Sequence, residues 1–510
     1  MEFVSDLPSS IYTSLVRFLS LIGCFLVHCL WHIIYYRYFH ELRHFPGPFW
    51  ASVTRLWYTW HFFNGTQTEA EWKAVQKYGP VIRVSPTMLL LAEADALPAV
   101  YHRRDIKGRY YLPGVFKTPN GIVMRHPGEQ SAHRRLVAAP YSMSNAAYLF
   151  SDTIADLTVR KPLGQVAAGG DAAGMLRQIR LGTFAFVILG SLYPLVEGIM
   201  SSPLGKYIAM RPEQKFGFGA VMSKADGILR ERKEALRKGE ITKAERGDGE
   251  YDFLQAFLDV RTPEGAYLDP DKIQTEIFVI LGAGFEAFQS TVSAVLVEVL
   301  SRPEILAKLE AELQSAVNTG KLTQPVPTCT EVATHLPYFV ACLREAMRLN
   351  PALAFTLPRE HTADDPELIL NGRVIQPGTE LACIPWISHR DRAVYGDDAE
   401  EYRPERWMGD DSARVRAFEK YNLAWGYGSR VCLGKHMATM MLYKVPVALF
   451  LAFEMALCKA SPGVPKPTVK PRGAALVWRD VWFDLRPRKG WAAEVVPDVL
   501  VAEETTLEEI

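Results

Sequence analysis

The stretch Trp425-Gly426-Tyr427-Gly428-Ser429-Arg430-Val431-Cys432-Leu433-Gly434 places one cysteine in a glycine-rich loop that leads into a helical pattern. Glycines permit positive φ angles and let the backbone pass close to a flat ligand, so amide N–H groups can point at the sulfur. These hydrogen bonds and the positive end of the following helix favour the thiolate form of cysteine, which is the form that binds metals. Arg430 adds a fixed positive charge for an anionic group of the ligand. The loop therefore predicts an iron site at Cys432.

This loop closely resembles the haem-binding signature of the cytochrome P-450 family, F-x-x-G-x-R-x-C-x-G, with Trp425 in place of Phe. The resemblance implies that heme b is the cofactor, that Cys432 is the axial ligand of its iron, and that Gly426, Arg430 and Gly434 help to bind it. Trp425 is either a change of aromatic side chain for packing or an indole N–H near the sulfur. The competing interpretation, a buried structural cysteine in a glycine-rich turn, leaves the further matches below unexplained.

Composition limits the kind of protein. The chain has 510 residues, 48% of them hydrophobic, so it can bury one large core or two smaller ones. Its 57 basic and 57 acidic side chains balance, so it lacks the excess of positive charge that is typical of nucleic-acid-binding proteins. Its seven cysteines have no paired spacing, which argues against a disulfide framework and for a reducing compartment. The family resemblance implies a mainly α fold with small β-sheets, preceded by one N-terminal transmembrane helix.

The N-terminal segment predicts a membrane anchor. Residues 18–34 are almost wholly apolar and approach bilayer-spanning length, and aromatic residues gather at their C-terminal end. Glu2, Asp6 and a single Arg17 precede the segment, while Arg37, His40 and Arg43 follow it, which mildly favours a cytoplasmic catalytic domain. A cleaved signal peptide is the alternative, but no small-residue cleavage site follows. We expect an anchor at 1–36 with a helix over about 15–36, a linker with Pro46-Gly47-Pro48 at 37–48, a haem-thiolate catalytic domain at 49–500 and an acidic tail at 501–510.

Two apolar runs, 81–84 and 88–91, are separated by the turn residues Ser85-Pro86-Thr87 and predict a β-hairpin. Further on, the segment around His133-Arg134-Arg135 resembles the helix of the family that approaches the haem through a W-x-x-x-R pair. Gln130 replaces the Trp, and Arg134 keeps the basic position. The resemblance implies that Arg134 contacts the haem; a solvated helix charge is the alternative.

A long helix is expected over 270–301, because Asp269 is a candidate N-cap and Pro270 occupies the first helical position. Its middle, Leu281-Gly282-Ala283-Gly284-Phe285-Glu286-Ala287-Phe288, contains two glycines, each of which costs about 1 kcal/mol relative to Ala. Either a closely approaching ligand or tight helix packing compensates for this cost.

This segment resembles the oxygen-binding helix of the family, whose pattern is [AG]-G-x-[DE]-T-[TS]. Ala283, Gly284 and Glu286 match, but Ala287 stands where the family has the Thr hydroxyl that assists proton delivery during oxygen activation. Thr291 lies about 6 Å along the axis, too far to replace that hydroxyl directly. Protons must therefore come through Glu286, ordered water or a substrate hydroxyl, or the reaction does not need them.

Charged residues in a further helix and a later segment complete the resemblance. Glu345 and Arg348 form an E-x-x-R pair, which is weak by itself but precedes Pro404-Glu405-Arg406-Trp407, similar to the family's P-E-R-F segment. The resemblance implies that Glu345, Arg348 and Arg406 form a buried structural ion triad bracing the haem loop, and that Arg359 reaches a haem propionate. A proline inside the helical pattern after Cys432, Pro446, predicts a kink or the end of that helix.

The expected function is that of a haem-thiolate monooxygenase of the microsomal type, with NADPH-cytochrome P-450 reductase as electron donor. The residues in these motifs are similar to those of fungal members such as the pisatin demethylase group. This resemblance implies a lipophilic substrate and a tailoring step in secondary-metabolite biosynthesis. Apolar residues expected to form the pocket and its lid, or else plain core, are Val115, Phe116, Ile122, Val123, Phe285, Phe288 and the region 184–210. Ala287 keeps open an atypical reaction such as desaturation, ring formation, coupling or isomerisation, and a haem-binding protein without catalysis remains a further alternative.

Overall fold

The computed structural model describes the chain from residue 9 to residue 488, apart from 103–104, 113, 117, 142–170, 172–173, 239–251, 410–411, 459–465 and 473–474. The predicted acidic tail at 501–510 lies outside the described residues. All seven cysteines are free.

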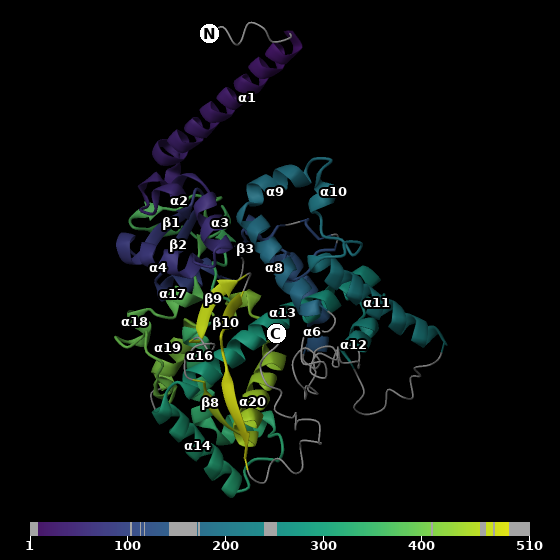
Figure 1. Cartoon of the computed structure of the whole chain (residues 1–510), viewed down its shortest axis with the longest axis vertical. Helices are drawn as coiled ribbons and strands as arrows, with labels where there is room; N and C mark the ends of the chain where they lie inside the picture. The colour runs from purple at the N-terminus through teal and green to yellow at the C-terminus, as the bar shows by residue number, and fades with distance from the viewer. Residues whose placement is uncertain are drawn as a thin grey trace, which may run out of the picture.

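Helices make up most of the described chain (Figure 1). The α-helices are α1 (Ser9–Ile34), α2 (Phe49–Val53), α3 (Leu56–Phe63), α4 (Gln67–Tyr78), α5 (Leu97–Val100), α6 (Pro127–Tyr141), α8 (Met175–Ser191), α9 (Tyr193–Met200), α10 (Gly205–Ile208), α11 (Gly217–Lys238), α12 (Phe253–Asp259), α13 (Pro270–Leu300), α14 (Pro303–Asn318), α15 (Cys329–His335), α16 (Pro337–Leu349), α17 (Pro385–Ser388), α18 (Arg392–Tyr395), α19 (Ser412–Lys420) and α20 (Lys435–Ala452). Short 3-10 turns lie at Glu41–His44, Ala94–Ala96, Arg109–Tyr111, Pro404–Trp407 and Gly428–Arg430, and a π turn lies at Tyr35–Phe39.

The described strands form one five-stranded sheet and three small hairpin-like pairs. The large sheet has the order β1-β2-β7-β4-β3, in which β2 and β7 are parallel and the other neighbours antiparallel. Its strands are β1 (Val81–Ser85), β2 (Met88–Leu91), β3 (Ile106–Lys107), β4 (Arg359–Glu360) and β7 (Glu380–Ala382). The other pairs are β5 (Ile369–Leu370) with β6 (Arg373–Val374), β8 (Phe453–Leu457) with β11 (Phe483–Pro487), and β9 (Thr468–Arg472) with β10 (Ala475–Arg479).

Helix α13 runs through the middle of the body and contributes to both large hydrophobic clusters (Figure 1). Ile277 and Leu281 join the cluster formed with α8, α11 and the hairpin, whereas Val295 and Val299 join the one formed with α14, α16 and α20. Asp269 caps the helix by accepting from the Asp271 N–H at 2.8 Å. One continuous helix thus connects the two halves of the core, as its sequence predicts.

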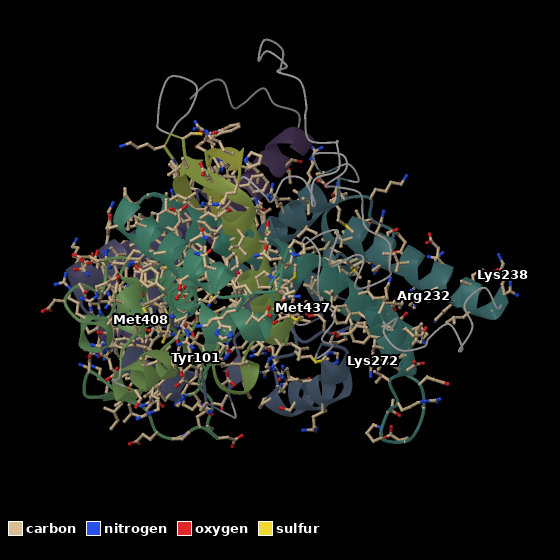
Figure 2. All side chains as sticks on the ribbon, turned by 90° about the horizontal axis from the view of Figure 1, so that it is seen from below. Tyr101, Arg232, Lys238, Lys272, Met408 and Met437 are labelled. Carbon is tan, nitrogen blue, oxygen red and sulfur yellow. The ribbon has the colours of Figure 1, made fainter. Side chains whose placement is uncertain are left out.

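Seen from below, α11 forms an arm that extends from the body and carries Arg232 and Lys238 toward its end (Figure 2). Tyr101 and Met437 lie inside the body instead, where they are 1% and 6% exposed. Tyr101 packs next to the cysteine loop and Met437 follows it on α20, so buried side chains flank the loop on both sides.

The N-terminal helix projects away from the body (Figure 1). Residues Val16–Phe39 are long and apolar enough to cross a membrane, and none of this segment is buried against the rest of the chain. Helix α13 also meets the length and composition criteria, but it runs through the core. After α1, Leu42 and Phe45 are buried against the sheet, and the Pro46 carbonyl accepts from the Arg83 N–H at 2.7 Å. The predicted linker therefore lies against β1.

The structure confirms a mainly α fold with small sheets, the hairpin at β1 and β2, and the long helix from Pro270. Of the two outcomes predicted at Pro446, a kink or the end of the helix, the helix end is wrong, because α20 continues through the proline to Ala452. Val447, Phe450 and Leu451 beyond the proline are buried in the second large cluster, and their burial offsets the lost hydrogen bond.

Candidate haem-thiolate site

The cysteine loop has the backbone that its glycines permit. Gly426 and Gly428 have φ angles of 77° and 60°, a region that other residues seldom adopt. A Cβ atom on Gly428 would lie 2.7 Å from the Tyr101 carbonyl oxygen. The Cys432 N–H donates to the Trp425 carbonyl at 2.6 Å and closes the loop. Glycine is therefore required at Gly428 both for the turn and for the close approach to the neighbouring chain.

Cys432 is exposed, so its sulfur is accessible to a ligand. The surrounding atoms still desolvate it, which raises the pKa of the thiol above its usual value. The Gly434 N–H, Arg134 and Lys435 act in the opposite direction but do not outweigh desolvation. The predicted hydrogen bond from a backbone amide is thus present, and two nearby cations add to it, yet together they do not produce a thiolate; a bound metal cation would.

Arginines from distant segments converge on this loop. The Arg134 guanidinium, on α6, donates to the carbonyl oxygen of Val431, the residue before the cysteine, at 2.5 Å. Arg430 lies within the loop and donates to the carbonyls of Met124 and Arg125 at 3.3 and 2.7 Å. Arg359, on β4, pairs with Asp105, whose other carboxylate oxygen lies 3.9 Å from the Arg430 Nε. All three arginines predicted from the sequence therefore lie on or next to the cysteine loop.

These residues fit an iron porphyrin. The accessible sulfur of Cys432 is a soft ligand suited to iron, and Arg430 and Arg359 provide cations for carboxylate groups at the edge of such a molecule. The Arg430 Nε and the Asp105 Oδ1 are buried without hydrogen-bond partners among the described residues. Buried polar groups are normally satisfied, so the Arg430 Nε, a donor without an acceptor among the described residues, fits a carboxylate of a bound group.

Glu345 on α16 forms the predicted buried ion set. Its carboxylate accepts from Arg348 Nε and Nη2 at 2.8 and 2.7 Å, from Arg406 Nε at 2.8 Å and from the indole of Trp407 at 2.8 Å. Glu345, Arg348 and Arg406 are at most 1% exposed. The pKa of Glu345 is lowered, because hydrogen bonds and charges from the two arginines outweigh the desolvation that acts to raise it.

His389 connects this ion set to the cysteine loop, although no sequence-based prediction included this residue. Its Nδ1 lies 3.0 Å from the Arg348 carbonyl, and its Nε2 accepts from the Leu423 N–H at 2.7 Å. Burial lowers the pKa of His389 to about 3, so the ring is neutral and can donate at one nitrogen while accepting at the other. The Leu423 carbonyl in turn accepts from Gly426 at 2.8 Å. The ring's partners are backbone groups far apart in sequence, so no local signal marks it.

The middle of α13 shows how its motif departs from the expected pattern. A Cβ on Gly282 would meet no atom within 4 Å, so tight helix packing does not explain this glycine. The Glu286 carboxylate lies 3.8 Å from the Arg180 Nε of α8. The Thr291 hydroxyl donates to the Ala287 carbonyl at 2.9 Å, so helix α13 itself uses this hydrogen. Thr291 therefore does not replace the hydroxyl that is missing at Ala287.

Apolar residues expected around the substrate come together beside α13. The rings of Phe186, Phe218 and Phe278 have centroids 5.7 to 6.2 Å from that of Phe116. The Met210 N–H donates to the Val115 carbonyl at 2.9 Å, joining the segment after α10 to this cluster. Val115, Phe116 and Val123 are buried, whereas Ile122 is 39% exposed. Phe186 and Met210 of the predicted lid region thus belong to the buried cluster around Phe116.

Comparison with known proteins agrees with this geometry. The cytochrome P450 family model matches residues 201–479. "Quiannulatic acid synthase" of Emericella variicolor is 44% identical over 508 aligned residues, covering 93% of this chain and 95% of the relative. "Cytochrome P450 monooxygenase gsfF" of Penicillium aethiopicum is 29% identical, with 84% and 91% covered, and "Cytochrome P450 monooxygenase pkfB" of Emericella nidulans is 28% identical, with 82% and 87% covered. With its thiol-bearing loop, its ion set and these relatives, the chain belongs to the cytochrome P450 family of haem-thiolate oxidoreductases.

Proposed function

We propose that this chain is a membrane-anchored monooxygenase that binds heme b through Cys432 and oxidises a lipophilic small molecule. Its electrons come from NADPH-cytochrome P450 reductase, and the reaction is a tailoring step in fungal secondary-metabolite biosynthesis. The observation that carries the proposal is the convergence of Arg134, Arg359 and Arg430 on the loop of an accessible cysteine. The fungal relatives named as monooxygenases support the same reaction class.

A thiolate-ligated haem supplies oxygen activation when bound, because the sulfur donates electron density that favours O–O cleavage. The chain's own residues then have three tasks. Cys432 provides the ligand, and the neutral His389 fixes the loop that holds it relative to α16. The aromatic cluster around Phe116 excludes water and binds apolar substrate. Glu286, paired with Arg180, is the acidic group of α13 nearest to the missing hydroxyl and is proposed to hold a proton there.

Substitution of Cys432 tests the site directly. Cys432→Ser should abolish the ferrous–CO absorption band that is characteristic of thiolate ligation, because a serine hydroxyl does not replace a thiolate on iron. Cys458→Ser, at a half-buried cysteine outside the site, is the matched control and should leave the band unchanged. Retention of the band in Cys432→Ser would refute the assignment of the ligand.

The product class can be read from mass. Comparing metabolites of the source organism with and without the gene, and feeding back the compound that accumulates, gives the mass difference between substrate and product. A gain of one oxygen supports a single monooxygenation. The acid in the name of the Emericella variicolor relative makes a gain of two oxygens with loss of two hydrogens, from methyl to carboxyl, the first multistep product to look for.

A second candidate function rests on Ala287. This position has no hydroxyl, and the Thr291 hydroxyl is bonded to the helix backbone. The missing hydroxyl is the structural reason to consider an atypical reaction such as desaturation, ring formation, coupling or isomerisation. Loss of two hydrogens, or an isomer, in the same metabolite comparison would favour it. Absence of any substrate-dependent NADPH oxidation with reductase present would instead support a non-catalytic haem protein.

The proposed location is the endoplasmic reticulum membrane, with one span and the catalytic domain in the cytoplasm. Exposed apolar residues on α2, α3, α9 and α10 support it, because these helices lie at the end of the body from which α1 projects (Figure 1). They are Trp50, Trp60, Phe63, Leu195 and Tyr207, and Leu204 directly precedes α10. Extraction of the full-length protein by alkaline carbonate would contradict membrane integration, and protection of the large domain from protease in intact microsomes would contradict the orientation.

A further inference from the structure

Strands β3 and β4 place two cations directly opposite each other. Lys107 of β3 pairs with Arg359 of β4 in the antiparallel register. Side chains of directly opposed residues project from the same face of the sheet, and like charges in such a pair destabilise it. Both residues are buried, at 7% and 5% exposure. Water therefore does little to screen this repulsion, and something else must compensate for it.

The nearby carboxylate does not balance the charge. Asp105, two residues before Lys107, accepts from the Arg359 Nε with Oδ2, while its Oδ1 lies 3.9 Å from the Nε of Arg430. Arg359 and Arg430 thus share one carboxylate, and with Lys107 protonated these four buried side chains carry two positive charges in excess. An uncompensated buried charge is expensive, so the site is built for a partner that brings two negative charges.

Backbone contacts place Lys107 beside the cysteine loop. The carbonyl oxygen of Arg125 accepts both from the Lys107 N–H at 3.2 Å and from the Arg430 Nη2 at 2.7 Å. The Lys107 ammonium donates to the carbonyls of Gly121 and Ile122 at 2.9 and 2.7 Å. An ammonium has three N–H donors, so the third is left with the ring of Tyr111, whose centroid lies 4.8 Å from the Nζ, and a carboxylate acceptor would be a stronger partner than the ring. Burial and the charges of Arg359 and Arg430 lower the pKa of Lys107, an effect that an anion placed against the three cations would reverse.

We propose that Lys107 is a third cation that binds the haem propionates together with Arg359 and Arg430, and that Asp105 is a positioning residue that orients both guanidinium groups. This inference rests on the proposed ligation of haem by Cys432. The two carboxylates of the porphyrin match the two excess positive charges. Arg430 lies two residues before Cys432, so one loop presents both the iron ligand and a propionate cation.

The test uses full-length holoenzyme carrying Lys107→Met, Lys107→Arg or Asp105→Asn. Transfer of haem to excess apomyoglobin measures the rate of haem loss, and spectroelectrochemistry measures the haem reduction potential. Lys107→Met should lose haem at least about tenfold faster, since a hydrogen bond to a charged group typically contributes that much or more. Lys107→Arg keeps the charge and should lose haem more slowly than Lys107→Met. Lys73→Met, at a lysine that is 72% exposed in its pair with Glu69, is the matched control.

The reduction potential separates an electrostatic role from a purely structural one. Removing a positive charge near the haem favours the ferric state and should lower the potential in Lys107→Met. Removing a negative charge should raise it in Asp105→Asn. Equal potentials in both variants, with unchanged haem loss in Lys107→Met, would overturn the inference and leave a site for another dianion such as phosphate. A wild-type protein without the thiolate-type CO band would instead refute the proposed function on which the inference rests.

Discussion

Replacement of Glu345 by Gln should destabilise the folded protein by about 3 to 5 kcal/mol, the cost of breaking a buried ion set by removing one partner. The carboxylate accepts five N–H groups, from Arg348 (two), Arg406, Trp407 and the Arg403 backbone. Glutamine keeps the shape of the side chain but has one acceptor oxygen, and its NH2 group faces donors. The two arginines remain buried and lose their common counter-charge.

The matched control is Glu419→Gln. Glu419 also pairs with an arginine, Arg344, at 3.3 Å, but the two side chains are 55% and 41% exposed. Such a surface pair contributes less than about 1 kcal/mol. The assay is urea unfolding of the purified holoenzyme followed by circular dichroism, with haem content recorded in parallel. If Glu345→Gln unfolds at the same urea concentration as Glu419→Gln, the buried set does not brace the fold.

The pH dependence of this difference has a definite sign. The pKa of Glu345 is lowered in the folded protein, so its stabilising effect is fully present above the pKa of the unfolded chain. It is lost only as the pH falls through the folded value. The stability difference between wild type and Glu345→Gln should therefore be constant from pH 6 to 8 and shrink in acid below the usual carboxyl range. A difference that shrinks between pH 8 and 6 would contradict this assignment.

Three further changes test other parts of the structure. Burial raises the pKa of Glu71 to about 8, so as the pH rises this carboxyl ionises in the unfolded chain before it ionises in the folded protein. The free energy of unfolding therefore falls between pH 4.5 and 8. Glu71→Gln should raise the free energy of unfolding by about 3 kcal/mol at pH 7 and flatten its pH dependence. An unchanged profile would show that Glu71 is already ionised. Ala287→Thr should raise the fraction of NADPH converted to product, and no gain would indicate that a substrate hydroxyl delivers the proton. His389→Leu removes the hydrogen bond to the Leu423 N–H and should increase the rate of haem loss. In the wild type, titration of His389 should not change this rate between pH 6 and 8, because its pKa of about 3 lies far below that range.

Sequence patterns predicted the elements whose signals are local. The turn residues between 81–84 and 88–91 were enough for the hairpin, and Asp269 with Pro270 marked the start of α13. The positive φ angles of Gly426 and Gly428 are expected from residue type alone. Pro446 shows the limit of such reasoning, because the helix penalty of proline is local, while the burial of Phe450 and Leu451 that offsets it depends on partners from other helices.

The candidate site was predictable only where a motif carried it. Glu345 and Arg348 are an ordinary i, i+3 pair by sequence. The buried ion set can be recognised only in the fold, where Arg406 and Trp407 of a separate segment donate to the Glu345 carboxylate. Asp105 and Lys107 had no motif at all. Their role depends on the register that sets Lys107 opposite Arg359, and register between strands more than 200 residues apart is a tertiary property.

The cysteine loop and the middle of α13 are held by different contacts, so they can change independently. Hydrogen bonds through His389 and the ion set of α16 fix the loop, and these contacts are complete. Core packing on both sides fixes α13, and it is unaffected by whether residue 287 carries a hydroxyl. Retention of the haem-binding machinery therefore does not imply that protons are delivered in the usual way. Because Cys432 is proposed to hold the haem and residue 287 to affect the later delivery of protons, variants at the two positions should report on separate steps of one reaction.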